Sequence, residues 1–158
     1  MDSLYFDLLQ FGYHVGLALL VGGAIALGAA AAPALFGTAP SRGEAGTLFG
    51  AVLARWDGLA ILAVVLVGLT SILKALAFEV PEPRLYIRWG ALALLGAASL
   101  YSAAWLNPVA RSIRSQTPAF DDLPADSPLR REFARLHAGS RRAMSLAVVF
   151  GLVALFFS

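Results

Sequence analysis

Six polar side chains carry most of the chemistry that this sequence can offer, and they gather at one end of its long apolar runs. They stand where three of those runs begin or end, and they are Asp57, Asn107, Arg111, His137, Ser140 and Arg141. An ionisable group within an apolar run is costly to desolvate, so each is a candidate for ligand or ion binding. His137 and Arg141 are four residues apart and therefore share a helix face. We expect the six to meet in one buried cluster, which is either an ion-paired network that fixes helix register or a binding site.

A second candidate site lies toward the other end of the runs and consists of His14 and Lys74. His14 falls just inside the first run, and Lys74 falls near the end of the second. Together they could bind a ligand. The sequence favours a simpler arrangement, in which His14 bonds to a neighbouring helix and the Lys74 side chain snorkels outward to lipid headgroups.

His14 and His137 also raise the question of haem, because histidines in a four-helix bundle can be its axial ligands. At about 1.5 Å per helical residue the two would lie roughly 30 Å apart along the membrane normal, so they cannot ligate one haem together. Either histidine alone could still hold one. The chain has two histidines and two methionines, too few for a Met-rich or multi-His copper path. Metal and cofactor therefore stay unassigned.

Several classes of protein are excluded by what the sequence lacks. It has no cysteine, which rules out disulfides, Cys-ligated zinc, iron–sulfur clusters and thiol catalysis. Paired carboxylates, His-Glu-x-x-His, a phosphate loop and a nucleophile elbow are absent too, so a non-enzymatic role is favoured. The basic residues stand beside apolar runs, where membrane insertion accounts for them, and we expect no nucleic-acid partner.

The composition is that of an integral membrane protein. Hydrophobic residues make up 59% of the 158 residues and charged residues 14%, with the charges clustered between long uncharged runs. A bilayer core of roughly 30 Å needs roughly 20 helical residues. Four runs meet this requirement, and we predict a single all-α domain, a four-helix transmembrane bundle in contact with the lipid bilayer. The predicted spans are about 8–36, 57–78, 89–106 and 141–158.

Local signals set the ends of these helices. Ser41 and Glu44 have the spacing of a capping box, which predicts a helix start at about Arg42. Ser127 before Pro128 predicts the start of the last helix, which extends well before its apolar part. Pro33 predicts a kink or an end in the first helix. The small residues of that helix, including a Gly-x-x-x-Gly motif at Gly12 and Gly16, predict close packing against another helix.

The positive charges predict the orientation in the cell membrane. Counting Lys and Arg gives two in the first loop, three in the second and seven in the third, so one side carries 2 + 7 = 9 and the other 3. By the positive-inside rule, the first and third loops are cytoplasmic and both termini are extracytoplasmic.

Four stretches of the sequence resemble one known family: Gly22-Gly23, Ala32-Pro33-Ala34-Leu35-Phe36, Phe133 to Ser140 with its Leu-His-x-x-Ser motif, and Gly151 to Leu155. They are similar to the bacterial branch of the transmembrane protein 205-like family, small four-helix membrane proteins of unknown function. The resemblance spans nearly the whole chain. It implies a four-helix membrane protein, and eukaryotic members are linked with tolerance to metal-containing drugs. Where the family often has Asn shortly after the serine, this chain has Arg141-Arg142-Ala143-Met144.

Three classes of function follow from these patterns. The first is transport of, or tolerance to, a small molecule or metal ion, favoured by the inward polar residues and by the resemblance. The second is a structural or accessory subunit, in a homo-oligomer or a larger membrane complex, favoured by the many small residues. The third is a haem- or quinone-handling membrane protein, favoured only by His14 and His137.

Overall fold

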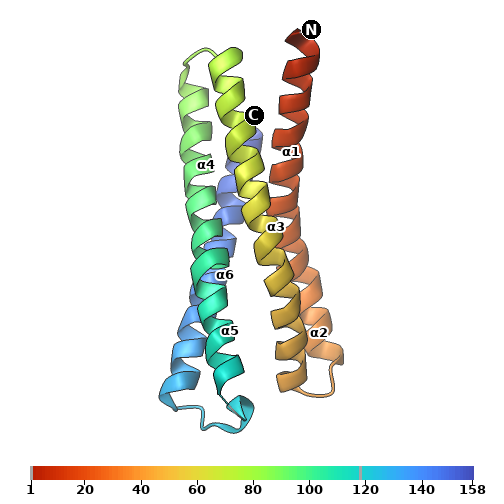
Figure 1. The fold of residues 1–158 in the computed structure, drawn as a ribbon, viewed down its shortest axis with the longest axis vertical. Helices are drawn as coiled ribbons and strands as arrows, with labels where there is room; N and C mark the ends of the chain where they lie inside the picture. The colour runs from red at the N-terminus through yellow and green to blue at the C-terminus, as the bar shows by residue number, and fades with distance from the viewer. Residues whose placement is uncertain (1, 118) are drawn as a thin grey trace.

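The computed structural model describes residues 2–117 and 119–158, and these residues form four long helical rods with no strand (Figure 1). Two of the rods are interrupted by a π-helical turn, so they are built from several labelled elements. In chain order the elements are α1 (Asp2–Ala26), η1 (Leu27–Ala31), α2 (Ala32–Thr38), α3 (Arg42–Ala77), α4 (Pro83–Tyr101), η2 (Ser102–Leu106), α5 (Asn107–Gln116), η3 (Phe120–Asp122) and α6 (Pro128–Phe156).

Each rod is long and apolar enough to cross a membrane. The four candidate spans are Ser3–Thr38, Arg42–Ala77, Pro83–Gln116 and Pro128–Phe156. This confirms the predicted helical membrane bundle. The helices exceed the predicted spans because polar turns continue them beyond the apolar runs. A rod of 34 residues is about 50 Å long, against a bilayer core of roughly 30 Å, so its ends project past the hydrocarbon.

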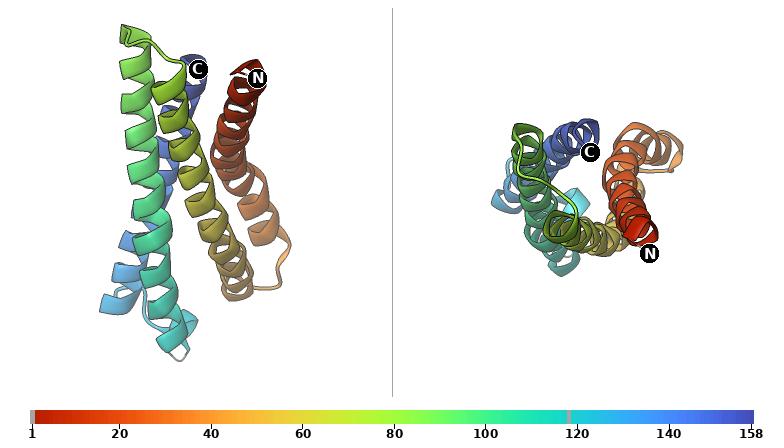
Figure 2. Two further views of the ribbon diagram at one scale, coloured as in Figure 1. Left: turned by 45° about the horizontal axis from the view of Figure 1, so that its top comes forward. Right: turned by 90° about the horizontal axis from the view of Figure 1, so that it is seen from above.

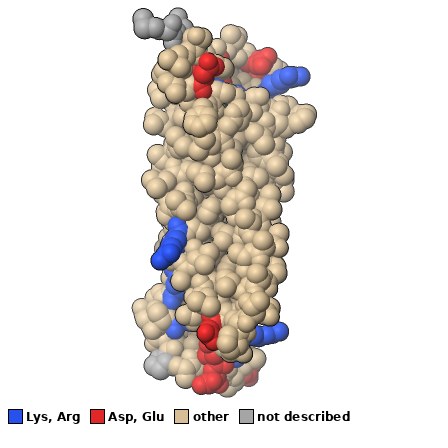
Figure 3. All heavy atoms as spheres, turned by 90° about the vertical axis from the view of Figure 1, so that its right-hand side faces the viewer, with Lys and Arg blue, Asp and Glu red and all other residues tan. Residues whose placement is uncertain are grey.

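The charged residues follow this division. The face drawn in Figure 3 has a wide band without Lys, Arg, Asp or Glu, and its acidic residues lie near the two ends of the molecule. Many large apolar side chains are exposed along the rods, among them Leu62, Leu76 and Phe156. A water-soluble protein of this size would bury such residues, whereas lipid solvates them.

The rods pack as two hairpins, with α1 against α3 and α4 against α6 (Figures 1 and 2). Residue 2, the C-terminus and the α3–α4 linker lie at one end of the bundle, called here the terminal end (Figure 1). The segments that join α2 to α3 and α5 to α6 lie at the other, called the loop end. Between them is a core of mostly small and aliphatic residues: Tyr13, Leu17, Leu20, Ala60, Ala63, Val67, Ala91, Leu92, Leu95 and Ala154.

Two serine caps set the predicted helix starts. The Ser41 hydroxyl accepts a hydrogen bond from the Glu44 backbone N–H at 3.1 Å, and α3 begins at Arg42. The Ser127 hydroxyl accepts one from the Arg130 backbone N–H at 3.4 Å, and α6 begins at Pro128. Both starts are therefore confirmed, because a side-chain oxygen satisfies a backbone donor that has no partner within the helix.

Each π-helical turn ends two residues before a proline. The turn η1 precedes Pro33, and η2 precedes Pro108. Proline has no N–H and its ring clashes with the carbonyl four residues earlier, and a wider turn relieves the clash while the rod continues. The first helix therefore has its irregularity beside Pro33, where the sequence predicted a kink or an end, but it runs on to Thr38.

Glycines let α1 approach α3 closely, as the sequence predicted. A Cβ atom at Gly16 would lie 2.5 Å from Val67 Cγ2 and 3.2 Å from the Ala63 carbonyl oxygen. A Cβ at Gly12 would lie 3.0 Å from Thr70 Cγ2, and one at Gly23 would collide with the Trp56 ring. By contrast, Gly22 is exposed on a different face of the same helix and has open space around it.

Candidate functional site

A buried network around Asp57 joins three of the four rods. Asp57 on α3 is 4% exposed, and its carboxylate accepts hydrogen bonds from Asn107 Nδ2 at 2.7 Å and from an Arg111 Nη1 at 2.5 Å. The Ser140 hydroxyl on α6 donates to Asn107 Oδ1 at 2.6 Å. One charge of each sign is thus paired at short range, with neutral groups completing the hydrogen bonds. The structure brings together four of the six residues that the sequence singled out.

Ser102 is a member of this network that sequence reasoning missed. Its hydroxyl lies 2.9 Å from that of Ser140, and it is 3% exposed. Ser102 and Asn107 are five residues apart, a spacing that puts side chains on different faces of an α-helix. The π-helical turn between them brings positions five apart onto one face, and the Asn107 N–H donates to the Ser102 carbonyl. Pro108 is the sequence signal from which this turn could have been predicted.

Arg141 and His137 do not join the network in the way the sequence predicted. Arg141 is exposed, so its expected place in a buried cluster is wrong. Arg141 directly follows Ser140, and one residue rotates a helix by about 100°, so its side chain turns away from the network and lines an open cavity instead. His137 is half-buried and stacks on Phe133, with ring centroids 6.1 Å apart and an angle of 2° between the planes.

Two adjoining cavities lie between α2–α3 and α5–α6, beside the Asp57 network. Their volumes are about 290 and 360 Å³, and Phe36, Phe49, Leu53 and His137 line both. We call this pair of cavities the loop-end cleft. Of the residues that the structure describes, four arginines line the cleft, namely Arg42, Arg111, Arg114 and Arg141, and no Asp or Glu does.

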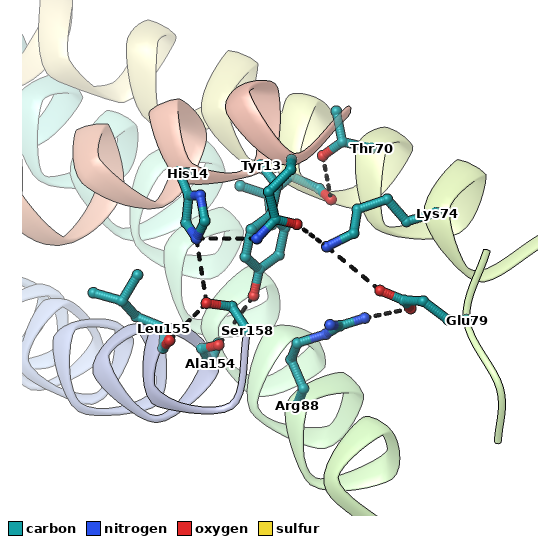
Figure 4. Close-up of polar contacts among 11 residues, drawn as sticks. Tyr13, His14, Thr70, Lys74, Glu79, Arg88, Ala154, Leu155 and Ser158 are labelled. Carbon is teal, nitrogen blue, oxygen red and sulfur yellow. Dashed lines mark hydrogen bonds and ion pairs between the residues drawn. The ribbon is translucent and has the colours of Figure 1, made fainter. Parts of the chain in front are cut away.

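At the terminal end, Lys74 is buried rather than snorkelled. The prediction of an outward lysine is wrong, because Lys74 is 2% exposed and has partners inside the bundle. Its ammonium donates to Gln10 Oε1 and forms an ion pair with Glu79 at 3.4 Å (Figure 4). Arg88 on α4 pairs with the same carboxylate and is 6% exposed. Glu79 lies two residues beyond the end of α3, where its backbone N–H donates to the Lys74 carbonyl at 3.2 Å, and this local turn places a counter-ion within reach of Lys74.

Tyr13 and His14 complete this group from α1. The Tyr13 ring centroid lies 5.0 Å from Lys74 Nζ and 5.7 Å from Arg88 Cζ, and the Tyr13 hydroxyl donates to the Ala154 carbonyl at 3.1 Å. His14 Nε2 lies 3.4 Å from Gln10 Nε2 and 3.2 Å from the Ser158 hydroxyl (Figure 4). His14 was expected to bond to a neighbouring helix, and its partner is instead Ser158, two residues beyond the end of α6. Within the described residues, no hydrogen bond joins His14 to Lys74 directly.

Comparison with known proteins places the chain in a family. Residues 15–119, more than half of the chain, match the family model described as a domain of unknown function, DUF4149. The chain belongs to the DUF4149 family. That family is uncharacterised, and its description does not mention the transmembrane protein 205-like family, so the resemblance is supported only as far as a membrane family of unknown function. No curated protein and no solved structure matches the chain.

Most of the polar residues described above fall inside the DUF4149 match. Asp57, Lys74, Glu79, Arg88 and Asn107 lie within it, whereas Ser140 and His137 lie beyond it. Sequence reasoning missed Gln10, Tyr13 and Glu79, which contact Lys74, and Arg88, which pairs with Glu79. The four-residue spacing of Gln10 and His14 was the one visible signal, because it puts two polar side chains on one helix face.

The two histidines of this DUF4149 protein are far apart. His14 contacts Ser158 at the C-terminal end of α6, and His137 lies about six turns earlier on that helix, roughly 30 Å away. Geometry therefore excludes a haem ligated by both. Among the described residues, no group of three or more His, Cys, Asp and Glu side chains could hold a metal ion.

Proposed function

We propose that the protein binds a small amphipathic anion in the loop-end cleft, as the first step of a transport or tolerance function. The observation that carries this proposal is the lining of the cleft, which combines aromatic and aliphatic walls with four arginines and no carboxylate. An apolar pocket of a few hundred Å³ with a few convergent polar groups is the usual form of a small-molecule site.

The charges of the cleft are only partly balanced from within the protein. Arg111 pairs with Asp57, and Arg114 pairs with Asp121 at 2.7 Å. Within the described residues, Arg42 and Arg141 form no ion pair, which leaves two positive charges beside an apolar cavity. A ligand with one anionic group and an apolar tail complements both features, since guanidinium groups bind carboxylate and phosphate well.

The apolar part of such a ligand has a defined place. The rings of Phe36 on α2 and Phe49 on α3 meet edge to face with centroids 6.2 Å apart, and both line the two cavities. Phe133 closes the cleft from α6. The Phe36 side chain is also exposed on the outside of the bundle, which leaves a route by which a tail can enter the cleft.

A small molecule suits the chain better than a metal ion as the substrate of a transport or tolerance function. The cleft lining offers cationic groups, which repel metal ions, and it lacks the carboxylate or multi-histidine sets that bind them. Neither an accessory-subunit function nor haem or quinone handling has a specific observation in its favour.

The binding test compares ligands that share a tail and differ in charge. The purified protein in nanodiscs is titrated with dodecyl phosphate, dodecanol and dodecyltrimethylammonium, and binding is measured calorimetrically. We expect saturable binding of dodecyl phosphate, weaker binding of dodecanol and none of the cation. Equal affinity for all three ligands would mean that the cleft only solvates alkyl chains, and would contradict the proposal.

Variants locate the site. Arg42→Gln/Arg141→Gln should weaken dodecyl phosphate binding about tenfold, since it removes the two arginines without internal partners. The matched control is Arg131→Gln/Arg142→Gln, which changes the net charge equally at exposed positions outside the cleft. The control should lose less than about twofold. Equal losses in the two double variants would place the ligand elsewhere.

Transport of the ligand across the bilayer would require more than binding in the cleft. The packed core, with Leu17, Val67 and Leu95 nearly inaccessible, separates the cleft from the terminal end. A transporter would have to open this core, whereas a binding or tolerance protein would not. Uptake of dodecyl phosphate by proteoliposomes, compared with vesicles that contain Arg42→Gln/Arg141→Gln, separates these two functions.

The proposed orientation has the loop end in the cytoplasm and both termini outside the cell membrane, from the nine-to-three distribution of Lys and Arg. Because no native cysteine exists, single cysteines can be introduced at Ser3 and Ser115, which are both exposed. An impermeant thiol reagent added to intact cells should label Ser3→Cys and leave Ser115→Cys unlabelled. The reverse pattern would invert the topology and put the cleft outside.

A further inference from the structure

The terminal end of the bundle contains a cavity of about 530 Å³ that the proposed function does not use. Charged and polar side chains make up most of its lining: Gln10, Lys74, Glu79, Glu82, Arg84, Arg88 and Ser158. Three of the charged side chains are basic and two are acidic, so these side chains carry 3 − 2 = +1. The cavity is therefore a polar space with a surplus positive charge, whereas aromatic and aliphatic side chains form the walls of the loop-end cleft.

The surplus charge is buried. Lys74 and Arg88 are 2% and 6% exposed, and they share the single carboxylate of Glu79. Glu82 and Arg84 stand at the exposed rim, where solvent screens them. Two desolvated cations with one counter-ion are unfavourable unless a further anion is present, because each buried charge needs a partner.

Arg88 also has a donor without an acceptor. Its Nε is buried and has no hydrogen-bond partner among the described residues. A buried N–H of a charged group that makes no bond is rare in proteins, and it commonly marks the place of an ion or water. The guanidinium has donor capacity beyond its bond to Glu79, which is the geometry that recognises carboxylate and phosphate.

Aromatic rings hold the two cations in place. Lys74 Nζ lies 5.6 Å from the Phe6 ring centroid, and the Tyr13 ring contacts both Lys74 and Arg88 (Figure 4). Such cation–π contacts fix the positive groups before any ligand arrives, so little side-chain ordering remains for binding.

We propose that this cavity binds a compact anion that carries a phosphate or carboxylate group, held by Lys74 and Arg88 beside Glu79. The anion is either the headgroup of an anionic lipid or a free solute, since both carry the same chemistry. The site shares no residue with the loop-end cleft, so its test does not depend on the outcome of the test of the proposed function.

The experiment measures thermal unfolding of the purified protein while anion is added. Inorganic phosphate and acetate are titrated in neutral detergent, with sodium chloride at matched ionic strength as the reference. In a parallel arm, nanodiscs of phosphatidylglycerol are compared with nanodiscs of phosphatidylcholine. Saturable stabilisation by phosphate or acetate identifies a free solute, and stabilisation by phosphatidylglycerol alone identifies a lipid headgroup. Absence of both effects would overturn the proposal.

Glu79→Gln gives the sharpest test, because it changes binding in the direction opposite to simple damage. The substitution removes the internal counter-ion, so the variant should be less stable without added anion and should bind the anion roughly tenfold more tightly. A purely structural Glu79 would leave the variant equally unstable at all phosphate concentrations, which would contradict an anion site.

Two further variants keep the test decisive if Glu79→Gln does not fold. Arg88→Lys keeps the charge and removes the planar fork, and it should weaken anion binding about fivefold. Arg84→Gln removes one positive charge at the exposed rim and should change binding less than about twofold. If the two variants weakened anion binding equally, the binding would reflect general electrostatic attraction, which would contradict the proposal.

Discussion

The bundle buries charge at two levels, and the two groups are balanced differently. Around Asp57, one carboxylate meets one guanidinium, and the Asn107 amide and serine hydroxyls bond to one another. Around Glu79, one carboxylate serves two cations, and the Arg88 Nε has no acceptor among the described residues. A neutral, satisfied network fixes how helices meet, whereas a charged, unsatisfied group is suited to receive a ligand.

The two groups also show why burial of a charged side chain alone is a poor guide to function. Asp57 and Lys74 are 4% and 2% exposed, which makes them nearly equal in accessibility. They differ in the number of opposite charges and acceptors within reach. Counting partners therefore separates a structural polar residue from a candidate ligand-binding residue more clearly than counting exposed area.

The largest expected effect is on stability at Asp57. Asp57→Ala leaves Arg111 and Asn107 without their acceptor, and the expected loss is roughly 2–4 kcal/mol, below the full cost for a buried pair because the Arg111 side chain is 35% exposed. Reversible unfolding in mixed micelles measures it. The double variant Asp57→Ala/Arg111→Ala should lose less than the sum of the single variants. If phosphate rescued Asp57→Ala as it is expected to rescue Glu79→Gln, the two groups would not differ in the way described.

The next effect concerns the helix seam that connects the two groups. Gly16→Leu forces a side chain against Val67 and the backbone of Ala63, and the expected loss is roughly 1–3 kcal/mol. Gly22→Leu is the matched control, because open space surrounds Gly22 on a different face of α1. Unfolding curves of the two variants should separate clearly. Coincident curves would mean that α1 does not depend on close contact with α3.

A smaller effect is expected at the serines of the Asp57 network. Ser140→Ala removes the donor to Asn107 Oδ1 and should cost about 1–2 kcal/mol, whereas Ser102→Ala leaves that bond intact and should cost under about 1 kcal/mol. The same micelle unfolding assay ranks them. If Ser102→Ala lost more stability than Ser140→Ala, the hydrogen bond between the two hydroxyls would stabilise the π-helical turn and not the Asn107 side chain.

The smallest effect on stability is expected at His137. His137→Ala removes a half-buried ring stacked on Phe133, at an expected cost under about 1 kcal/mol. Because His137 lines both cavities of the loop-end cleft, the variant should nevertheless weaken binding of dodecyl phosphate. Unchanged affinity in the calorimetric titration would remove His137 from the binding site.

The helices could be predicted from the sequence because their signals are local. Ser41 and Ser127 bond to backbone N–H groups three residues away, and a capping signal of that range is visible in a single stretch of sequence. The long apolar runs are equally local. The pairing of Asp57 with Arg111 could be anticipated as well, since both stand near the same end of neighbouring runs.

The burial of the Lys74 side chain could not be predicted in the same way. A lysine near a helix end normally reaches for headgroups, and that expectation fails here because the chain turns at the end of α3 and places Glu79 beside the Lys74 ammonium. The linker has no periodic pattern that reveals its path. The role of Tyr13 depends likewise on a contact between α1 and the distant helices α3 and α4.

The two π-helical turns limit how the length of their helices can change during evolution. A π turn is what one inserted residue leaves behind in an α-helix, and each residue rotates the helix by about 100°. Deletion of one residue from Ser102–Leu106 would restore an ordinary helix, but it would turn every later residue of α5 away from its present neighbours. Asn107 and Arg111 would then leave Asp57 together. In this stretch an insertion or deletion is therefore far more damaging than a substitution, and relatives that keep the Asp57 network should keep the length between Ser102 and Asn107.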